Sequence, residues 1–358
     1  MIDRRRTTVI PLLAITLLIF VPSANGLATV NINELLSTCV DACSRGCVEI
    51  RSVQERRAAG DSFQVELKDA TDPKSALTEA DGASQAAIVN ALRLEWGLGL
   101  KIVGEEEDDD CEQGATQTRY NNVAKLRRDL CGELAIVEGN ELTLADVTVF
   151  VDPLDGTKEF VEGRLNNCQV LVGIAVAGKS AAGAIGVPFP NGDLSGESTI
   201  VFGQIDAGHG IIGSPFTPSS EAVRSGNLPR PLVASGDSTE PVMADSLKAV
   251  INRFGGSNVL YGGAGNKILS TALGHVDCTI QPKFGGPWDT CAPEAIIRSM
   301  GGQLTDLVGN DIVVYQSNTP KDSNTLGFLA TGKYSAIDHE ELCSILRALP
   351  AVQAYVSR

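Results

Sequence analysis

The sequence predicts a layered protein of mixed α+β and α/β class, an αβαβα sandwich in which layers of helices alternate with two sheets. Two long amphipathic patterns come first along the chain, and paired apolar runs typical of antiparallel strands follow them. Strand and helix patterns then alternate over residues 216–358, which is typical of an α/β layer. With 358 residues and 43% hydrophobic composition, the chain can bury such a core.

The first amphipathic pattern predicts a helix over residues 33–57. Cys39, Cys43 and Cys47 recur every four residues and therefore share one face, where free cysteines pack as small hydrophobic side chains. The Cys39-x5-Arg45 spacing also occurs in thiol phosphatases. That chemistry needs the thiolate at a helix N-terminus, and this pair falls inside the predicted helix. No cysteine spacing indicates zinc, so we expect mostly free, buried thiols.

A second helix over residues 78–96 and an antiparallel sheet complete the first part of the fold. The sheet is predicted from short apolar runs, the later ones arranged as hairpins. These runs cover residues 98–103, 147–151, 169–176, 182–188, 199–205 and 210–213. A stretch rich in Ser, Gly and Pro over residues 213–231 indicates a boundary. Residues 27–215 are therefore predicted to form an N-terminal unit of helix pair and sheet.

The remainder of the chain, residues 216–358, predicts a C-terminal α/β subdomain. Strands are expected over residues 231–235, 258–261, 276–282, 303–307 and 326–331. Helices are expected over residues 241–254, 266–275, 290–300 and 339–349. This subdomain would pack on the first unit and complete the layered sandwich.

The first 26 residues have the composition of a secretory leader. Arg4, Arg5 and Arg6 precede an apolar run of about a dozen residues, which is short for a membrane span, and small residues before Gly26 offer a cleavage site. Residues 1–26 are therefore predicted to be a signal peptide or signal anchor, with organelle targeting as the alternative. The prediction places the protein in the secretory pathway (Golgi or endoplasmic reticulum lumen, or secreted), and on a membrane only if the leader is retained.

The net charge of −15 argues against a nucleic-acid partner, because such binding depends on clustered Lys and Arg. A small phosphorylated ligand stays compatible with an acidic protein if cations lie between the two. The three histidines, His209, His275 and His339, are isolated, so a histidine general base is not expected. GGAGNK (262–267) lacks the GK[ST] ending of a phosphate loop.

Five carboxylates fall at the ends of predicted elements, where side chains from different segments can converge. They are Asp81, Glu105, Asp152, Asp155 and Asp289. Hard divalent cations such as Mg²⁺ prefer such oxygen ligands. Each carboxylate also has a purely structural interpretation. Asp81 can close a capping box with Thr78, and Asp289 can be a helix N-cap. Glu105 can belong to a solvated acidic run, and the stretch from Asp152 to Asp155 can be an ordinary turn.

Three motifs, VDPLDGTKEF (151–160), GGAGNK (262–267) and WDTCAPEAI (288–296), together resemble the inositol monophosphatase superfamily of magnesium-dependent, lithium-sensitive phosphatases. LTEAD (77–81) and IVGEEE (102–107) occur in the expected order and spacing, so the resemblance spans most of the chain. Within the superfamily, the motifs are most similar to those of the bisphosphate nucleotidases. The resemblance implies the αβαβα sandwich that this superfamily shares with the sugar bisphosphatases.

The resemblance also implies a role for each candidate residue. The metal ligands would be Glu105, Asp152, the Leu154 carbonyl, Asp155 and Asp289, holding two or more Mg²⁺ ions with Asp152 bridging. Asp81 and Thr157 would be the catalytic pair that orients and deprotonates the attacking water. The substrate would be bound by Gly156, Thr157, Gly263 and Lys267. Most of the metal ligands would thus lie in the N-terminal unit, and the C-terminal subdomain would complete the site.

The implied activity is hydrolysis of the 3′-phosphate of adenosine 3′,5′-bisphosphate, or of 3′-phosphoadenylyl sulfate, by two-metal-activated attack of water. One departure bears on the substrate, because bisphosphate nucleotidases usually carry Ser-His where this chain has Gly236-Asp237. An inositol polyphosphate 1-phosphatase is the alternative enzyme. A catalytically silent phosphonucleotide-binding protein is the alternative of another class, and the presence of both Asp81 and Thr157 argues against it.

Overall fold

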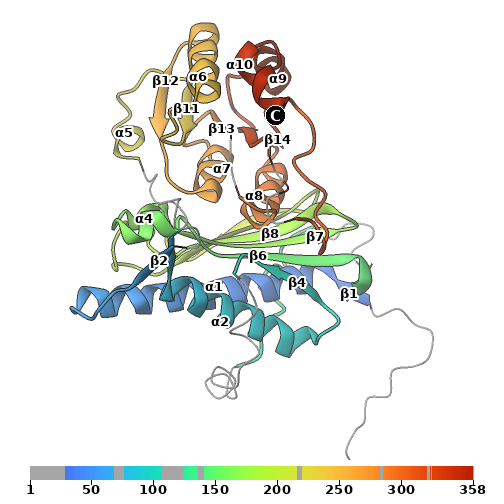
Figure 1. The fold of residues 1–358 in the computed structure, drawn as a ribbon. Helices are drawn as coiled ribbons and strands as arrows, with labels where there is room; N and C mark the ends of the chain where they lie inside the picture. The colour runs from blue at the N-terminus through green and yellow to red at the C-terminus, as the bar shows by residue number, and fades with distance from the viewer. Residues whose placement is uncertain are drawn as a thin grey trace, which may run out of the picture.

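The computed structural model describes residues 29–67, 76–106, 124–135, 141–215, 220–282, 285–320, 323 and 325–357. Two sheets and three groups of helices stack as alternating layers between the N-terminal helices at the bottom of Figure 1 and the C-terminal helices at its top. The layers are a helix pair, a six-stranded sheet, two helices, a five-stranded sheet and three further helices. The predicted αβαβα sandwich is therefore confirmed. The predicted leader, residues 1–26, lies outside the described residues.

The lowest layer in Figure 1 consists of α1 (Ile32–Ala58) and α2 (Glu79–Trp96), as predicted. Helix α1 begins after Asn31, whose side chain accepts hydrogen bonds from the backbone N–H groups of Asn33 at 3.0 Å and Glu34 at 3.3 Å. Its cysteine-bearing face is buried against the larger sheet. Because α1 and α2 pack against the sheet on one side, their opposite faces form one surface of the molecule.

The cysteines are free and buried wherever the structure describes them, which confirms the sequence prediction for this part of the chain. They are Cys39, Cys43, Cys47, Cys131, Cys168, Cys278, Cys291 and Cys343. Cys111 lies outside the described residues. Arg45 follows Cys39 within α1, so the Cys-x5-Arg spacing forms no phosphate-binding loop.

The larger sheet contains six strands, most of them near the predicted ranges. They are β4 (Lys101–Gly104), β6 (Val147–Asp155), β7 (Gln169–Val176), β8 (Lys179–Val187), β9 (Thr199–Gln204) and β10 (Gly208–Ile212). Their order is β10-β9-β8-β7-β6-β4. Neighbouring strands are antiparallel except β4 and β6, which are parallel, so the prediction of an antiparallel sheet is wrong at this edge. Parallel pairing is possible here because a long crossover connects the two strands.

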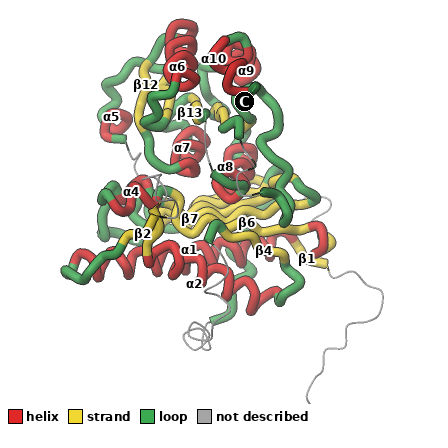
Figure 2. Tube along the Cα trace, viewed as in Figure 1, coloured by secondary structure: helices red, strands yellow, loops and turns green. Residues whose placement is uncertain are grey.

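Helices α7 (Ala264–Ala272) and α8 (Trp288–Ser299) form the middle layer, above the larger sheet in Figures 1 and 2. Helix α8 approaches β7 and β8 closely because Gly173 and Gly183 have no side chain. A Cβ on either glycine would lie 2.6 Å from a backbone atom of Ala292, closer than real contacts allow. This packing fixes α8, whose first turn carries Asp289.

The smaller sheet and its outer helices come from the C-terminal part of the chain. The strands are β11 (Leu232–Ser235), β12 (Ser257–Leu260), β13 (Cys278–Gln281), β14 (Gln303–Thr305) and β15 (Phe328–Thr331), in the order β12-β11-β13-β15-β14. The first three strands in that order are parallel, and β15 runs antiparallel to both of its neighbours. The outer helices are α6 (Pro241–Phe254), α9 (His339–Arg347) and α10 (Pro350–Val356), of which the sequence did not predict α10.

Shorter elements connect these layers. They are β1 (Thr29–Asn31) paired with β5 (Glu141–Thr143), the hairpin of β2 (Val65–Leu67) and β3 (Ala76–Thr78), the short helices α4 (Thr157–Val161) and α5 (Glu221–Arg224), and 3₁₀ turns at Leu144–Asp146 and Leu165–Asn167. Helix α4 matters most for function because it begins directly after β6. Across the described segments, no helix has both the length and the apolar character required to cross a bilayer.

Candidate active site

A bulge in β6 brings Asp152 and Asp155 to one side of the sheet. Both residues pair with β7, but three steps along β6 match two steps along β7. A spacing of three would place their side chains on opposite faces of a regular strand, and the extra residue restores a common face. Pro153, which has no N–H to donate, lies within the bulge. The predicted strand end at Val151 is therefore wrong, because the strand continues through the two aspartates.

Four carboxylates meet above this bulge and form the acidic floor of the site, defined as Glu105, Asp152, Asp155 and Asp289. Asp152, Asp155 and Asp289 each place a carboxylate oxygen within 4.8 Å of the others. Burial raises the pKa of Asp152 well above its usual range, and the nearby charges of the other three carboxylates raise it further. Like charges at such distances disfavour the ionised forms of the carboxylates. Cations bound between these oxygens would therefore stabilise the ionised cluster.

Asp155 is held by the N-terminus of α7. Its Oδ1 accepts a hydrogen bond from Ala264 N–H at 2.9 Å, and its Oδ2 accepts from Gly265 N–H at 2.8 Å and Asn266 N–H at 3.4 Å. Burial raises the pKa of Asp155 to about 6, against the lowering effect of these N–H groups and of Lys267. The GGAGNK segment therefore uses its helix N-terminus to hold a carboxylate, in agreement with its departure from a phosphate-loop motif.

Asp81 has both a structural and a candidate catalytic contact. Its Oδ2 accepts from Thr78 N–H at 2.8 Å and from Thr78 Oγ1 at 2.7 Å, which closes the capping box of α2. Its Oδ1 accepts from Thr157 Oγ1 at 2.8 Å, and the Leu154 carbonyl lies 3.0 Å from the same hydroxyl. Burial raises the pKa of Asp81 to about 7, although hydrogen bonds from the two threonines lower it.

Asp289 is not the N-cap of α8, which corrects that structural interpretation. The N-cap position is occupied by Pro287, and Asp289 lies in the first turn of the helix. Its Oδ2 accepts a hydrogen bond from Gly286 N–H at 2.6 Å, and the carboxylate is only partly buried. Asp289 therefore reaches the acidic floor from the opposite side to β6, where it contributes charge from the C-terminal part of the chain.

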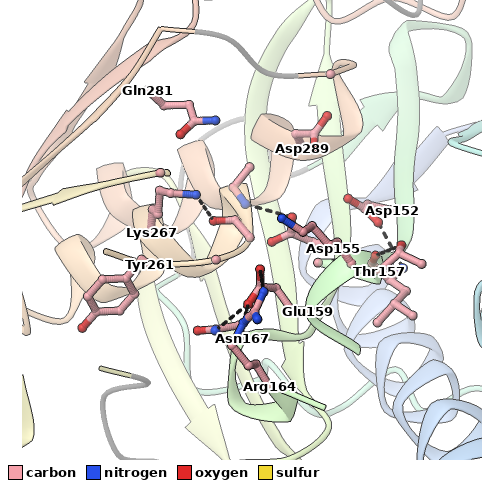
Figure 3. Close-up of a pocket in the computed structure, with 18 of the residues that line it drawn as sticks. Asp152, Asp155, Thr157, Glu159, Arg164, Asn167, Tyr261, Lys267, Gln281 and Asp289 are labelled. Carbon is pink, nitrogen blue, oxygen red and sulfur yellow. Dashed lines mark hydrogen bonds and ion pairs between the residues drawn. The ribbon is translucent and has the colours of Figure 1, made fainter. Parts of the chain in front are cut away.

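A cavity of about 840 Å³ opens above the acidic floor. Figure 3 shows Asp152 and Asp289 toward one side of this cavity and Lys267, Gln281 and Tyr261 toward the other. Among the lining residues in the described part of the chain, seven are carboxylates and three are Lys or Arg. The formal excess of four negative charges equals the charge of two divalent cations, so the donor set fits a two-metal site.

At the far side of the cavity, Lys267 is only 4% exposed and donates a hydrogen bond to the Gly263 carbonyl at 2.8 Å. Gly236 lies directly beside it. A Cβ on Gly236 would lie 3.3 Å from Gln281 Oε1 and 3.9 Å from Lys267 Cε. The Gly236-Asp237 departure noted in the sequence therefore falls at the cavity wall, next to the predicted substrate residue Lys267.

Five further charged residues line the cavity, and they are called the charged rim: Lys158, Glu159, Glu162, Arg164 and Asp237. Arg164 Nε and Nη2 donate to the Glu159 carboxylate at 2.5 and 2.8 Å, and Arg164 also pairs with Glu162. Lys158 Nζ lies 3.5 Å from Asp237 Oδ2 and 3.9 Å from Glu162 Oε1. Of this set, only Asp237 belongs to a feature that the sequence marks as a departure. For the others, the available signal was the cluster of charges of both signs after the DGT motif.

The structure brings the predicted site residues together around one cavity. Its lining includes the predicted metal ligands Glu105, Asp152, Leu154, Asp155 and Asp289, and the predicted substrate residues Gly156, Thr157, Gly263 and Lys267. Asp81 alone lies behind the wall, fully buried, and reaches the cavity only through Thr157. Sequence reasoning missed Tyr261 and Gln281, because neither belongs to a motif.

Comparisons with known proteins agree with this geometry. The sequence model of the inositol monophosphatase family matches residues 34–350. The 3′(2′),5′-bisphosphate nucleotidase 1 of Dictyostelium discoideum is 32% identical over 313 residues, covering 85% of this chain and 94% of that protein. The Golgi-resident adenosine 3′,5′-bisphosphate 3′-phosphatase of Callithrix jacchus is 26% identical over 340 residues, covering 93% of this chain and 84% of that protein.

A solved structure shows the same fold. The inositol monophosphatase of Thermotoga maritima superposes with a TM-score of 0.59 at 17% identity, covering 90% of this chain and 99% of that one. This chain and the Thermotoga protein thus share the layered sandwich although their sequences are only 17% identical. The prediction of a phosphatase enzyme with this fold is confirmed, and the chain belongs to the inositol monophosphatase family.

Proposed function

We propose that this protein is a Mg²⁺-dependent phosphomonoesterase that converts adenosine 3′,5′-bisphosphate to AMP and phosphate, and that can also accept 3′-phosphoadenylyl sulfate. The observation that carries the proposal is the hydrogen bond from Thr157 Oγ1 to Asp81 Oδ1 at 2.8 Å, at the edge of the acidic floor. A protein that only binds phosphorylated ligands needs no hydroxyl–carboxylate pair to move a proton. The names of the relatives in Dictyostelium and Callithrix support the same substrate class.

The acidic floor would hold the metal ions. Glu105, Asp152 and the Leu154 carbonyl would bind one Mg²⁺, and Asp152, Asp155 and Asp289 the other. The three aspartates each place a carboxylate oxygen within 4.8 Å of the others, and the four carboxylates of the floor carry the charge that two Mg²⁺ ions would balance. Bound ions would polarise the phosphoryl oxygens and lower the pKa of the attacking water.

Thr157 and Asp81 would move the proton. One hydroxyl proton can bond only one acceptor at a time, so Thr157 donates either to Asp81 or to the Leu154 carbonyl. When it donates to Asp81, a lone pair of Thr157 Oγ1 is free to accept a proton from water at the acidic floor. The threonine would at the same time pass its own proton to Asp81, so that the water is deprotonated and Asp81 carries the proton. The raised pKa of Asp81, about 7, suits a group that must accept a proton near neutral pH.

Two further predicted residues would position the substrate. Gly156 has φ +89°, and a Cβ there would lie 2.9 Å from the Asn167 carbonyl, so only glycine lets the chain turn from β6 into α4 at this point. The backbone N–H groups of Gly156 and Thr157 would then face the reacting phosphate. Lys267 would bind the second phosphate of the nucleotide, on the side of the cavity away from Asp289.

The compartment is a separate proposal. The Golgi-resident name of the Callithrix relative supports a lumenal location for this chain. The predicted leader, residues 1–26, would direct the protein there. A fluorescent protein fused to the C-terminus should then coincide with a Golgi marker, and removal of residues 1–26 should move the signal to the cytosol. Unchanged distribution after that deletion contradicts the proposal.

The activity is tested with a substrate panel. The full-length chain with Mg²⁺ should release phosphate from adenosine 3′,5′-bisphosphate, and Li⁺ should inhibit the release. Faster release from inositol 1,4-bisphosphate would favour the inositol polyphosphate 1-phosphatase. Tight Mg²⁺-dependent binding of the nucleotide without any release would overturn the enzyme and favour the silent binding protein.

A further inference from the structure

One ion pair among the lining residues joins two parts of the chain that are far apart in sequence. Lys158 lies in the first turn of α4, immediately after Thr157, whereas Asp237 follows the C-terminal end of β11. Their charged atoms, Nζ and Oδ2, are 3.5 Å apart, and both residues line the cavity. The pair therefore connects the layer that carries the acidic floor with the C-terminal α/β layer, directly beside the candidate catalytic threonine.

This pair is weak enough for an incoming anion to displace it. The Lys158 side chain is 32% exposed and that of Asp237 is 59% exposed, so solvent screens their attraction. Glu162 is a second acidic neighbour of Lys158, with its Oε1 3.9 Å from the Lys158 Nζ. A phosphate carries more charge than either carboxylate and offers more acceptor oxygens, so it can replace them as the partner of Lys158.

The two other cations among the described lining residues are held more firmly. Lys267 is nearly buried, donates to the Gly263 carbonyl, and interacts with the charge of Asp155. Arg164 forms two parallel hydrogen bonds with Glu159, a geometry that fixes the guanidinium. Of these three lining cations in the described part of the chain, Lys158 is thus the one most easily redirected toward a ligand that already occupies the acidic floor.

We propose that Lys158 joins Lys267 in binding the second anionic group of a doubly charged phosphate ester, and that Asp237 competes with this group for Lys158. The pair then sets how strongly the site prefers bis-anionic over mono-anionic phosphate esters. Gly236 adds no side chain of its own at this part of the cavity wall, where a Cβ would lie 3.3 Å from Gln281 Oε1 and 3.9 Å from Lys267 Cε. The proposal rests on the proposed phosphatase function, and it holds for a nucleotide or an inositol backbone alike.

The test compares matched mono- and bisphosphate substrates in the full-length protein. The nucleotide pair is adenosine 3′,5′-bisphosphate with adenosine 3′-monophosphate, and the inositol pair is inositol 1,4-bisphosphate with inositol 1-phosphate. The readout is the ratio of kcat/KM for the bisphosphate to that for the monophosphate. Lys158→Gln should lower this ratio roughly tenfold, mainly through KM, because a charged partner of the second phosphate is lost. Asp237→Asn should raise it about threefold.

Controls and a double variant separate this competition from general charge effects. Lys248→Gln and Asp245→Asn remove the same charges from exposed positions of α6 that do not line the cavity, and they should leave the ratio within twofold of the wild type. The gain from Asp237→Asn should shrink in a Lys158→Gln background. An undiminished gain would mean that Asp237 acts by long-range repulsion alone, and would overturn the competition.

Failure of the proposal and failure of the proposed function give different results. If Lys158→Gln changes mono- and bisphosphate turnover equally, the proposal is wrong while the phosphatase stands. If only the inositol pair is hydrolysed, the nucleotide assignment is wrong and the ratio is read from that pair. If nothing is hydrolysed, the phosphatase is wrong, and the ratio of dissociation constants for the two nucleotides in Mg²⁺, measured by calorimetry, decides the role of Lys158 by the same criterion.

Discussion

The acidic floor and the charged rim contrast in how their side chains are held. On the floor, Asp152 is 2% exposed and Asp155 is 6% exposed, and the backbone fixes both through the β6 bulge and the N-terminus of α7. On the rim, the Lys158 and Asp237 side chains are 32% and 59% exposed and are joined by an ion pair. Main-chain geometry therefore determines the floor, and side-chain choice determines the rim.

This difference separates reaction class from substrate choice. Moving a floor carboxylate requires a change in the backbone of β6 or in the packing of α7 and α8, which the whole sandwich resists. Changing a rim residue requires only one exposed substitution, which costs little stability. A family with this arrangement can keep its phosphatase chemistry while its members differ in the group attached to the phosphate.

The largest expected effect comes from breaking the floor. Asp155→Asn should lower kcat roughly a thousandfold or more, because it removes a negative charge proposed to hold a metal ion, and such ions supply several kcal/mol of transition-state stabilisation. The fold should persist, since the single asparagine oxygen can still accept from Gly265 and Asn266, and only the bond from Ala264 is lost. Phosphate release and circular dichroism measure the two effects, with Asp245→Asn as the matched control. Retained activity would remove Asp155 from the metal site.

The second largest effect on kcat is expected at Asp81, the proposed proton acceptor behind the acidic floor. Asp81 has a pKa of about 7, raised by burial, so it is increasingly protonated below that pH and cannot accept the Thr157 proton. We expect kcat to fall about tenfold for each unit of pH below 7. Asp81→Asn should lower kcat by roughly a hundredfold and abolish this dependence. A pH profile of the variant that keeps the wild-type slope assigns the titration to another group.

Much of the floor could be predicted from sequence because its residues belong to short, contiguous motifs. Asp152, Asp155, Gly156 and Thr157 stand within six residues, and each strand or helix boundary near them is marked by Gly, Pro or a charge. Periodicity located α1 and α2 to within a residue or two. Short sequence patterns were therefore sufficient to predict those elements whose conformation depends on neighbouring residues in the chain.

Features that depend on pairing between distant segments could not be predicted. The bulge of β6 exists only in its register with β7, and the sequence of β6 alone reads as a strand followed by a turn. Likewise, the hydrogen bonds from Ala264 and Gly265 to Asp155 join residues more than a hundred positions apart. Lys158 and Asp237 share no motif, so their ion pair required the three-dimensional arrangement.

A smaller effect is expected from hydrogen bonds that hold α8, the helix that carries Asp289. Tyr315 OH lies 2.7 Å from Glu294 Oε2 and 3.0 Å from Thr290 Oγ1, both in α8, and all three residues are buried. Tyr315→Phe removes these bonds and leaves polar groups of α8 unsatisfied, so the free energy of unfolding should fall by about 1–3 kcal/mol. Urea denaturation measures the loss. Tyr334→Phe, at an 87% exposed position, is the control and should be neutral.

Because α8 also carries Asp289, the same variant tests whether this support reaches the floor. Titration of Mg²⁺ by calorimetry should show weaker binding in Tyr315→Phe than in Tyr334→Phe if α8 shifts. Unchanged Mg²⁺ affinity with reduced stability would limit the Tyr315 network to a structural role. The floor would then be held mainly from β6 and α7 rather than from α8.

The smallest effect is expected at the rim. Glu162 is 40% exposed and pairs with Arg164 and, at 3.9 Å, with Lys158. Because exposed ion pairs are screened, Glu162→Gln should change the free energy of unfolding by less than about 0.5 kcal/mol. Any difference should vanish in 1 M NaCl, where the Debye length is about 3 Å. Urea denaturation at low and high salt measures both. A loss above about 1.5 kcal/mol that persists in salt would show that the rim is fixed as firmly as the floor, and substrate choice would then be as hard to change as the reaction itself.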